Sequence, residues 1–322
     1  MKLIIAFLRL VRWPNLVFIM LTQCLFYYCI ILPVFDRLAS TPVLTGPFFW
    51  LLVLASVLIA AAGYIINDYF DLNIDRVNKP DKLVVDKIIR RRWAILWHLI
   101  LSSVAILISI WVSWHLFDWH AFLAGLINIV CVAALWFYST TFKRKLLIGN
   151  VLISLLTAWT IFILFVVQLR SWFTVKVTYS IRHDYDTAAT RLFKYAILYA
   201  GFAFIISLIR EVIKDLEDME GDEKYGCRTM PIVWGVPAAK MFAAVWIVVL
   251  AATLCIIQFY VLQFGWWMAA AYCVVLIILP LIWTLRKLYH AKLPADYHRL
   301  SSLIKAIMLT GILSMLFFKL YS

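Results

Sequence analysis

Nine apolar runs of about twenty residues recur along the chain, and they constrain its fold more than any other feature. A run of that length crosses the ~30 Å hydrocarbon core of a bilayer as one α-helix. Only helices and closed barrels satisfy their backbone hydrogen bonds inside lipid, and the sequence lacks the alternating ten-residue pattern of a barrel. Its 65% hydrophobic and 15% charged residues also differ from the ~45–50% and ~25% of soluble domains. The sequence therefore predicts an all-α, polytopic membrane protein.

The predicted spans divide into two groups of four and a last helix. They cover, to within a few residues, 14–33, 47–66, 93–116, 119–138, 149–169, 192–210, 237–260, 265–285 and 301–320. We expect a single transmembrane domain over residues 1–322, with two repeated four-helix units at about 14–145 and 149–290 and a last helix at about 301–320. The polar, basic segment 170–191 matches no motif, and its role stays open.

Lys and Arg residues concentrate in the N-terminal tail and in the loops after spans two, four, six and eight. The positive-inside rule places these regions in the cytoplasm, at a plasma or inner membrane. The net charge of +13 suits membrane lipids with anionic headgroups and anionic substrates. It does not indicate nucleic acid, because the basic residues lie between hydrophobic spans.

The stretch NDYFDLNID, residues 67–75, places three carboxylates at the end of the second span. In a helix, Asp68, Asp71 and Asp75 stand at i, i+3 and i+7, on one face, with Asn67 near the same stripe. Like charges at this spacing repel each other unless a cation binds between them or water surrounds them. The motif is therefore compatible both with a solvated helix end and with a cation site.

The same spacing recurs 147 residues later, after the sixth span, in REVIKDLEDMEGDEKYG. Mg²⁺ prefers oxygen ligands and is typically held by one or two carboxylates together with substrate phosphates. Two such motifs at one membrane face predict a site that binds Mg²⁺ and a diphosphate. The predicted metal ligands are Asp68, Asp71, Asp75, Asp215, Asp218 and Asp222, of which Asp71 and Asp218 are also predicted to be catalytic.

Basic residues would complete a diphosphate site, because a diphosphate carries more charge than the metal ions neutralise. The candidates are Lys143 and Arg144 in YSTTFKRK, Lys214 and Arg210 in the second motif, and Arg76 in the first. Lys binds phosphate as a point charge and Arg as a planar fork, and we expect Lys214 to take part in catalysis. The alternative for each residue is a charge that only sets the membrane orientation.

The two motifs resemble those of the UbiA superfamily of intramembrane prenyltransferases. NDYFDLNIDRVNKP is similar to its first Asp-rich motif, REVIKDLEDMEGDEKYGCRTMPIVWG to its second, YSTTFKRKLLIGN to the segment after helix four, and RWPN to the start of helix one. The resemblance implies nine transmembrane helices around a central cavity, capped by cytoplasmic loops. It also implies that Mg²⁺ binds a prenyl diphosphate whose prenyl group moves to a lipophilic acceptor. The further residues that match family positions in the substrate pocket are Asn15, Asn67, Tyr138 and Lys143.

One loop departs from the family pattern. Many members continue after NKP with an Arg-Pro sequence, whereas this chain reads DKLVVDK, so we expect Lys82 to replace that Arg as a phosphate contact. The second motif most resembles the digeranylgeranylglyceryl phosphate synthase group, which favours geranylgeranylglyceryl phosphate as the acceptor. An aromatic acceptor of quinone biosynthesis, such as 4-hydroxybenzoate or a naphthoate, is the alternative. An ion-coupled transporter is disfavoured, because the acids lie at span ends and few glycines interrupt the helices.

Overall fold

A computed structural model describes residues 2–38, 41–80, 83–116, 119–168 and 179–321. Within these ranges the chain is helical, without a β-strand. The described residues contain nine helices that are long and apolar enough to cross a membrane: Trp13–Asp36, Gly46–Phe70, Arg91–Leu116, Phe122–Thr140, Ile148–Gln168, Thr187–Glu217, Val236–Leu262, Trp267–His290 and Pro294–Tyr321. The prediction of an all-α, polytopic integral membrane protein is confirmed.

Proline residues mark both the beginnings and the irregular turns of these helices. Pro occupies the first turn of α2 (Trp13–Phe26), α4 (Gly46–Phe70), α13 (Val236–Leu262) and α16 (Pro294–Leu313), where its missing N–H costs nothing. Two spans contain a π-helical turn just before a proline. These turns are η1 (Tyr27–Ile31), followed by α3 (Leu32–Asp36), and η4 (Val274–Ile278), between α14 (Trp267–Cys273) and α15 (Leu279–His290). Proline has no N–H to donate to the preceding turn, and a π-helical turn adjusts the backbone to this missing hydrogen bond.

The chain divides into two compact units. Unit 1 contains Met1–Phe142 and Trp159–Leu198, and unit 2 contains Lys143–Ala158 and Tyr199–Ser322. Two long helices, α8 (Ile148–Gln168) and α10 (Tyr179–Glu217), contribute one part to each unit.

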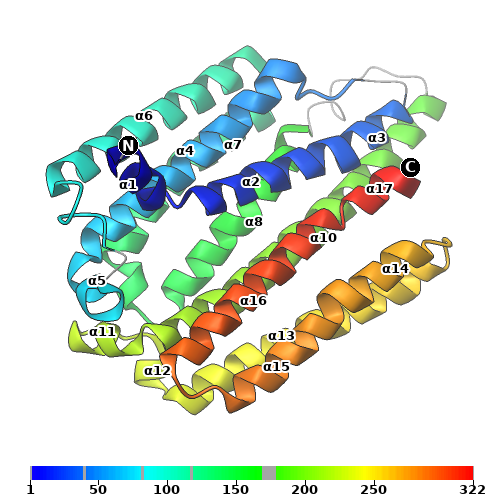
Figure 1. Ribbon diagram of the computed structural model, residues 1–322. Helices are drawn as coiled ribbons and strands as arrows, with labels where there is room; N and C mark the ends of the chain where they lie inside the picture. Colours follow the sequence, from blue (N-terminus) through cyan, green and yellow to red (C-terminus); the bar gives the residue numbers. More distant parts are fainter. Residues whose placement is uncertain (1, 39–40, 81–82, 117–118, 169–178, 322) are drawn as a thin grey trace. The chain divides into compact units, whose positions relative to one another are not determined.

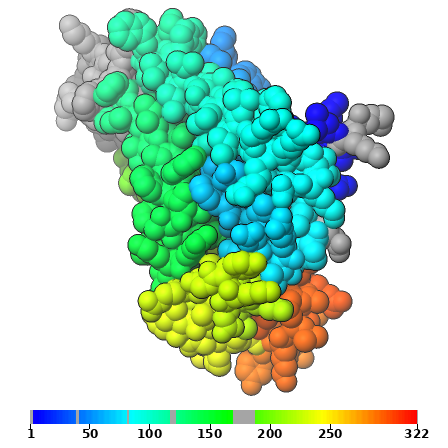
Figure 2. Space-filling view, turned by 90° about the vertical axis from the view of Figure 1, so that its left-hand side faces the viewer, coloured from blue at the N-terminus to red at the C-terminus, as the bar shows by residue number. Residues whose placement is uncertain are grey.

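In unit 1, α4 packs against α2, α6 (Arg91–Leu116) and α7 (Trp119–Thr140), as the blue to teal helices of Figure 1 show. Gly63 of α4 lies where this helix approaches α7 closely. A Cβ atom built on Gly63 would lie 2.9 Å from Leu135 Cδ1. The outer side of α6 exposes Trp93, Leu107 and Trp114, and the space-filling view shows this helix in cyan and teal at the surface (Figure 2). Large exposed apolar side chains on a membrane-spanning helix are suited to contact lipid.

The first helix, α1 (Lys2–Leu10), is short and amphipathic. Ala6 and Leu10 are buried in a cluster with Val84, Val85 and Ile89, which follow the first carboxylate motif. The opposite face of α1 carries four exposed apolar side chains: Leu3, Ile4, Ile5 and Leu8.

In unit 2, the C-terminal half of α10 packs with α13, α15 and α16 around a common apolar core. Its fully buried members include Ile209, Ile213, Leu281 and Ile304. The three C-terminal helices are drawn in yellow, orange and red in Figure 1. The short helices α12 (Met230–Val233) and α17 (Leu316–Tyr321) complete the unit.

The helices extend beyond several of the predicted spans. The sixth span, predicted at 192–210, is part of α10, which runs from Tyr179 to Glu217. The prediction ended at the first charged residues, but Arg210 and Lys214 both donate to Glu211, and the helix continues through them. Part of the segment 170–191 therefore belongs to α10, whereas residues 169–178 lie outside the described residues.

Candidate active site

The first carboxylate motif lies across a junction between two helices. α4 ends at Phe70 and α5 (Leu72–Asn78) follows. Asp71 stands between them with φ −83° and ψ −2°, outside regular helical values. The backbone N–H groups of Asp71 and Asp75 still bond to the carbonyl groups four residues earlier, at 2.9 Å and 2.8 Å. The three carboxylates thus keep helical spacing, but they do not share one regular helix as the sequence suggested.

The second motif has the same local geometry. α10 ends at Glu217, Asp218 follows with φ −96° and ψ 6°, and α11 (Met219–Lys224) begins directly after it. The N–H of Asp218 bonds to the carbonyl of Lys214 at 2.9 Å, and the N–H of Asp222 to the carbonyl of Asp218 at 3.2 Å. In both motifs, therefore, the middle carboxylate marks the end of a membrane-spanning helix.

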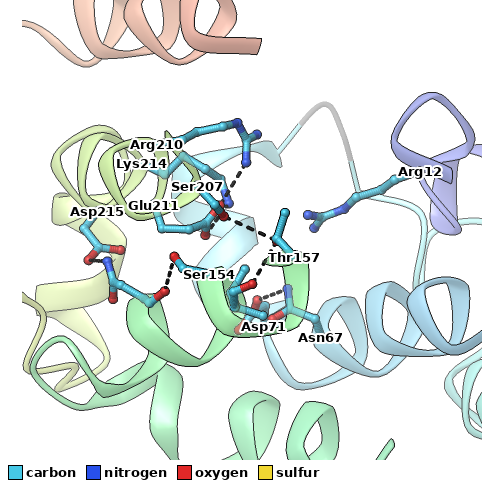
Figure 3. A network of polar contacts seen from close by, with 12 residues as sticks. Arg12, Asn67, Asp71, Ser154, Thr157, Ser207, Arg210, Glu211, Lys214 and Asp215 are labelled. Atoms are coloured by element: carbon cyan, nitrogen blue, oxygen red, sulfur yellow. Dashed lines mark hydrogen bonds and ion pairs between the residues drawn. The ribbon is translucent and has the colours of Figure 1, made fainter. Parts of the chain in front are cut away.

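The middle carboxylate of the first motif is buried beside an amide. Asp71 is 3% exposed, and its Oδ2 accepts a 2.6 Å hydrogen bond from Nδ2 of Asn67. Oδ1 of Asn67 is itself buried and finds no hydrogen-bond partner among the described residues. Figure 3 shows Asn67 and Asp71 side by side. The pair presents hard oxygen atoms, the type of ligand that Mg²⁺ takes.

The leading carboxylate of the first motif forms an ion pair. Arg12, directly before α2, donates from Nη2 to Oδ1 of Asp68 at 2.7 Å. Its guanidinium also lies over the ring of Tyr64, 5.0 Å from the centroid. Partial burial lowers the pKa of Arg12, but the charge of Asp68 more than offsets this, and the net pKa is above its ordinary value. Arg12 therefore remains a cation.

In unit 2, polar side chains of α8 and α10 face each other. Asn150, in the first turn of α8, donates from Nδ2 to Oδ2 of Asp215 at 2.8 Å. Glu211, which is buried, accepts from Arg210 at 2.8 Å and from Lys214 at 3.2 Å. Figure 3 shows Arg210, Glu211 and Lys214 gathered along this helix. Charged groups inside a membrane span are costly, and they are usually paired and functional.

The remaining predicted residues lie in both units. Asn15 and Tyr138 are half-buried in unit 1, in α2 and α7. Arg76 is exposed and pairs with Asp86 at 2.9 Å. Lys143 and Arg144 form a 3₁₀ turn, η3 (Phe142–Arg144), at the start of unit 2.

The 3₁₀ turn is bonded to the chain that follows the second motif. The carbonyl of Arg144 accepts from the N–H of Arg228 at 2.9 Å, and both residues belong to unit 2. Lys82 lies outside the described residues.

The oxygen atoms of the two carboxylate motifs are of the type that binds Mg²⁺, although the described side chains do not form a complete set of metal ligands. Among the described side chains, no group of three or more His, Cys, Asp or Glu could hold a metal ion. Each motif does present carboxylates, and the first motif adds an amide oxygen atom. Asp222 is 4% exposed, Asp71 is similarly buried, and Oδ1 of Asn67 accepts no hydrogen bond from the part of the chain that the structure describes. This chemistry fits a hard divalent cation whose remaining ligands are water and phosphate.

Sequence reasoning missed three residues that hold this arrangement together: Arg12, Asn150 and Glu211. Arg12 was counted only among the basic residues of the N-terminal tail. The other two could have been noticed in the sequence: Asn150 is an amide at the start of the apolar fifth span, and Glu211 is an acid at the end of the sixth. Polar residues in apolar segments indicate a paired or functional site, but their partners depend on helix packing.

The sequence pattern of the UbiA prenyltransferase family matches residues 37–307, which is most of the chain. The chain belongs to the UbiA prenyltransferase family. A curated relative, the digeranylgeranylglyceryl phosphate synthase of Methanosphaera stadtmanae, is 30% identical over 184 residues. That alignment covers 57% of this chain and 57% of the relative's length.

Solved structures of UbiA proteins share the fold. A structure described as digeranylgeranylglyceryl phosphate synthase in membranes has a TM-score of 0.58 at 21% identity, covering 98% of this chain and 99% of that one. A UbiA homolog from Archaeoglobus fulgidus, bound to DMAPP and Mg²⁺, has a TM-score of 0.55 at 17% identity, covering 96% and 98%. At these identities the likeness establishes the fold alone.

Proposed function

We propose that the protein is a Mg²⁺-dependent intramembrane prenyltransferase. It would move a prenyl group from a prenyl diphosphate to a lipophilic acceptor, with geranylgeranylglyceryl phosphate as the favoured acceptor. In this reaction the C1–O bond of the prenyl diphosphate breaks and diphosphate leaves. A new bond forms between C1 and a hydroxyl oxygen of the acceptor, whose proton is released.

The observation that carries this proposal is the repeated geometry of the two carboxylate motifs. Each motif follows an even-numbered span, and for this reason we assign both motifs, with the N-terminus, to the cytoplasmic side of the membrane. Each places its middle carboxylate, Asp71 or Asp218, at the end of a membrane-spanning helix. A scaffold gives no reason for this duplication, and a transporter would be expected to carry its acids at the middle of the spans.

The proposed metal ligands are Oδ1 of Asn67 and the carboxylates of the two motifs: Asp68, Asp71, Asp75, Asp215, Asp218 and Asp222. Mg²⁺, when bound, would neutralise charge that develops on the departing diphosphate. The Archaeoglobus fulgidus homolog, which is bound to DMAPP and Mg²⁺, supports this choice of metal and of donor.

Basic side chains would hold the diphosphate oxygens. We assign this role to Lys143, Arg144 and Lys214, and we assign Asn15 and Tyr138 to the pocket of the prenyl donor. Arg76 is proposed to contact the phosphate of the acceptor, which would require it to exchange its exposed ion pair with Asp86. Surface ion pairs contribute only ~0–1 kcal/mol, so this exchange costs little.

The relative from Methanosphaera stadtmanae is named a digeranylgeranylglyceryl phosphate synthase. This name supports geranylgeranylglyceryl phosphate as the acceptor. A phosphate-bearing acceptor also agrees with the basic character of the loop after the first motif. An aromatic acceptor of quinone biosynthesis is the second candidate, because the same donor chemistry serves both.

Product analysis distinguishes the two acceptors. Purified protein in lipid nanodiscs would receive geranylgeranyl diphosphate and Mg²⁺ with geranylgeranylglyceryl phosphate, 4-hydroxybenzoate or a naphthoate. We expect mass spectrometry to detect the prenylated glyceryl phosphate. A prenylated aromatic product alone would favour the second candidate, and the absence of any Mg²⁺-dependent product would reject the transferase proposal.

A further inference from the structure

One part of unit 1 joins α1 to the chain between the first motif and α6. Leu10 of α1 and Ile89 are buried in the same apolar cluster. Phe7 of α1 also lies against Trp97 of α6, with their ring centroids 5.1 Å apart, and Figure 1 shows α1 beside this end of α6. The outward-facing side chains of α1 and of residues 84–93 therefore belong to one packed part of the protein.

Residues 84–89 form a tight turn in this region. The N–H groups of Ile88 and Ile89 bond to the carbonyl of Val84 at 2.9 Å and 3.1 Å, and the N–H of Asp86 bonds to the carbonyl of Ile89 at 2.8 Å. Lys87 and Ile88 are exposed in this turn. A cation and an apolar side chain thus stand next to each other at the surface.

The exposed cations of this region lack carboxylate partners. Four of them form no ion pair with any described residue: Arg9, Lys87, Arg90 and Arg92. The acid of the turn, Asp86, is already paired with Arg76 at 2.9 Å. The region therefore presents positive charge that the described part of the chain does not neutralise.

Apolar side chains are exposed on the same elements. Leu3 and Ile4 of α1 are each 66% exposed, and Trp93, which follows the basic run, is exposed as well. Trp is typical of the boundary between hydrocarbon and headgroups. Orientation of the spans requires positive charge alone, and it does not explain why the cations are combined with apolar side chains. Together they have the character of a surface that lies at a lipid interface and attracts anionic headgroups.

We propose that α1 and residues 84–93 form a binding surface for anionic phospholipids of the surrounding bilayer. The phosphate groups of these lipids contact the four unpaired cations, and the exposed apolar side chains enter the boundary of the acyl chains. A cluster of four to eight basic residues beside a membrane-spanning helix is typical of such binding. The surface acts whether or not the protein transfers prenyl groups, because its ligand is the membrane lipid itself.

Lipid retention measures this preference directly. The protein would be purified in micelles that contain equal parts of phosphatidylglycerol and phosphatidylcholine with the same acyl chains, and native mass spectrometry would count the lipids that stay bound. The test variant carries Lys87→Gln, Arg90→Gln and Arg92→Gln. The matched control removes the same charge from exposed cations of unit 2 with Arg286→Gln, Lys287→Gln and Lys292→Gln. Thermal unfolding checks that both variants are folded.

We expect the wild type to retain phosphatidylglycerol in preference to phosphatidylcholine. The test variant should reduce this preference by about 10–100-fold, because each basic residue near the membrane surface strengthens anionic-lipid binding by about fivefold. The control variant should keep most of the preference. An equal loss in both variants would show that net charge alone attracts the lipid, and the inference would be wrong. A wild type that retains the two lipids equally would also overturn it.

A second measurement needs no variant and covers the case in which the test variant does not fold. Phosphatidylglycerol with a photoreactive group on its headgroup would be cross-linked to the wild-type protein, and the labelled peptides would be identified by mass spectrometry. We expect label in residues 3–10 and 84–97. Label confined to other loops would place the anionic lipid elsewhere and reject the proposed surface.

Discussion

Asp71 and Asp218 occupy equivalent backbone positions in two separate units. Each follows the last residue of a membrane-spanning helix and precedes a short helix, and their φ values are −83° and −96° with ψ near zero. The equivalence extends along the chain, because Asp75 and Asp222 each lie in the first turn of the short helix that follows. Two stretches 147 residues apart thus fold alike around their middle carboxylate.

Replacement of either middle carboxylate should abolish transfer without unfolding the protein. We expect Asp71→Ala and Asp218→Ala each to lower kcat by about 10²–10³-fold, the range for loss of one group that stabilises developing charge. Radiolabelled prenyl transfer measures the rate, and thermal unfolding checks the fold. Glu223→Ala, an exposed acid of α11, is the matched control and should retain activity. Full activity in both Asp variants would contradict the assignment.

Removal of the metal should stop the reaction reversibly. EDTA is expected to eliminate product formation, and added Mg²⁺ should restore it. Ca²⁺ should restore much less, because it is larger and prefers six to eight ligands at longer distances than Mg²⁺. The measurement is product yield against the concentration of each cation in nanodiscs. Unchanged turnover after exhaustive chelation would show that the carboxylates serve another purpose.

Glu211 should matter for stability because it is a buried carboxylate between two cations. Glu211→Ala leaves Arg210 and Lys214 without this partner, and we expect the free energy of unfolding to fall by about 3 kcal/mol. Glu217→Ala on the same helix is the comparison, since its partner His298 is 54% exposed and the loss should be under ~1 kcal/mol. Denaturation in mixed micelles measures both, and similar losses would show that the cluster is not specially stabilising.

Lys214 should contribute to binding of the diphosphate. Lys214→Ala removes a cation, and we expect KM for the prenyl diphosphate to rise by about 10-fold or more, because a hydrogen bond to a charged group contributes ~1.5–3 kcal/mol. Lys214→Arg should recover part of the affinity, since the charge remains. Steady-state kinetics with varied diphosphate measures this effect. An unchanged KM in Lys214→Ala would show that Lys214 does not bind the diphosphate and serves only in the ion pair with Glu211.

Two glycines of unit 2 should respond in opposite ways to alanine. A Cβ on Gly311 of α16 would lie 2.5 Å from a ring carbon of Phe202 on α10, whereas a Cβ on Gly201 meets nothing within 4 Å. We expect Gly311→Ala to destabilise the protein by about 1–3 kcal/mol and Gly201→Ala to be neutral or stabilising by up to ~1 kcal/mol. Thermal unfolding of the two variants checks the packing of α10 on α16.

The sequence predicted the membrane helices well because lipid imposes a length and a composition on them. All nine predicted spans correspond to helices among the described residues. Their ends were less accurate, as in α10, because charged residues such as Glu211 can stay inside a helix when they are paired. Hydropathy registers a charge but does not register its partner.

The candidate site was predicted only in part. Spacing and resemblance singled out the carboxylates, and their assignment as ligands stays a prediction. The break at Asp71 was not foreseen, because i, i+3, i+7 spacing is also that of an unbroken helix. The bonds from Arg12 and Asn150 connect residues 56 and 65 positions apart. Contacts of that range depend on packing between helices, which a single sequence does not reveal.

The short helix α1 has a consequence for how the protein would meet the substrates proposed for it. Its outer face carries Leu3, Ile4, Ile5 and Leu8, while its inner face packs on the chain that follows the first motif. We expect a helix of this kind to lie in the membrane plane at the level of the headgroups. Contact between α1 and the lipid would then hold the first motif at the depth of the headgroups. Donor and acceptor could arrive by lateral diffusion, with their phosphates at headgroup height and their tails still dissolved in the bilayer.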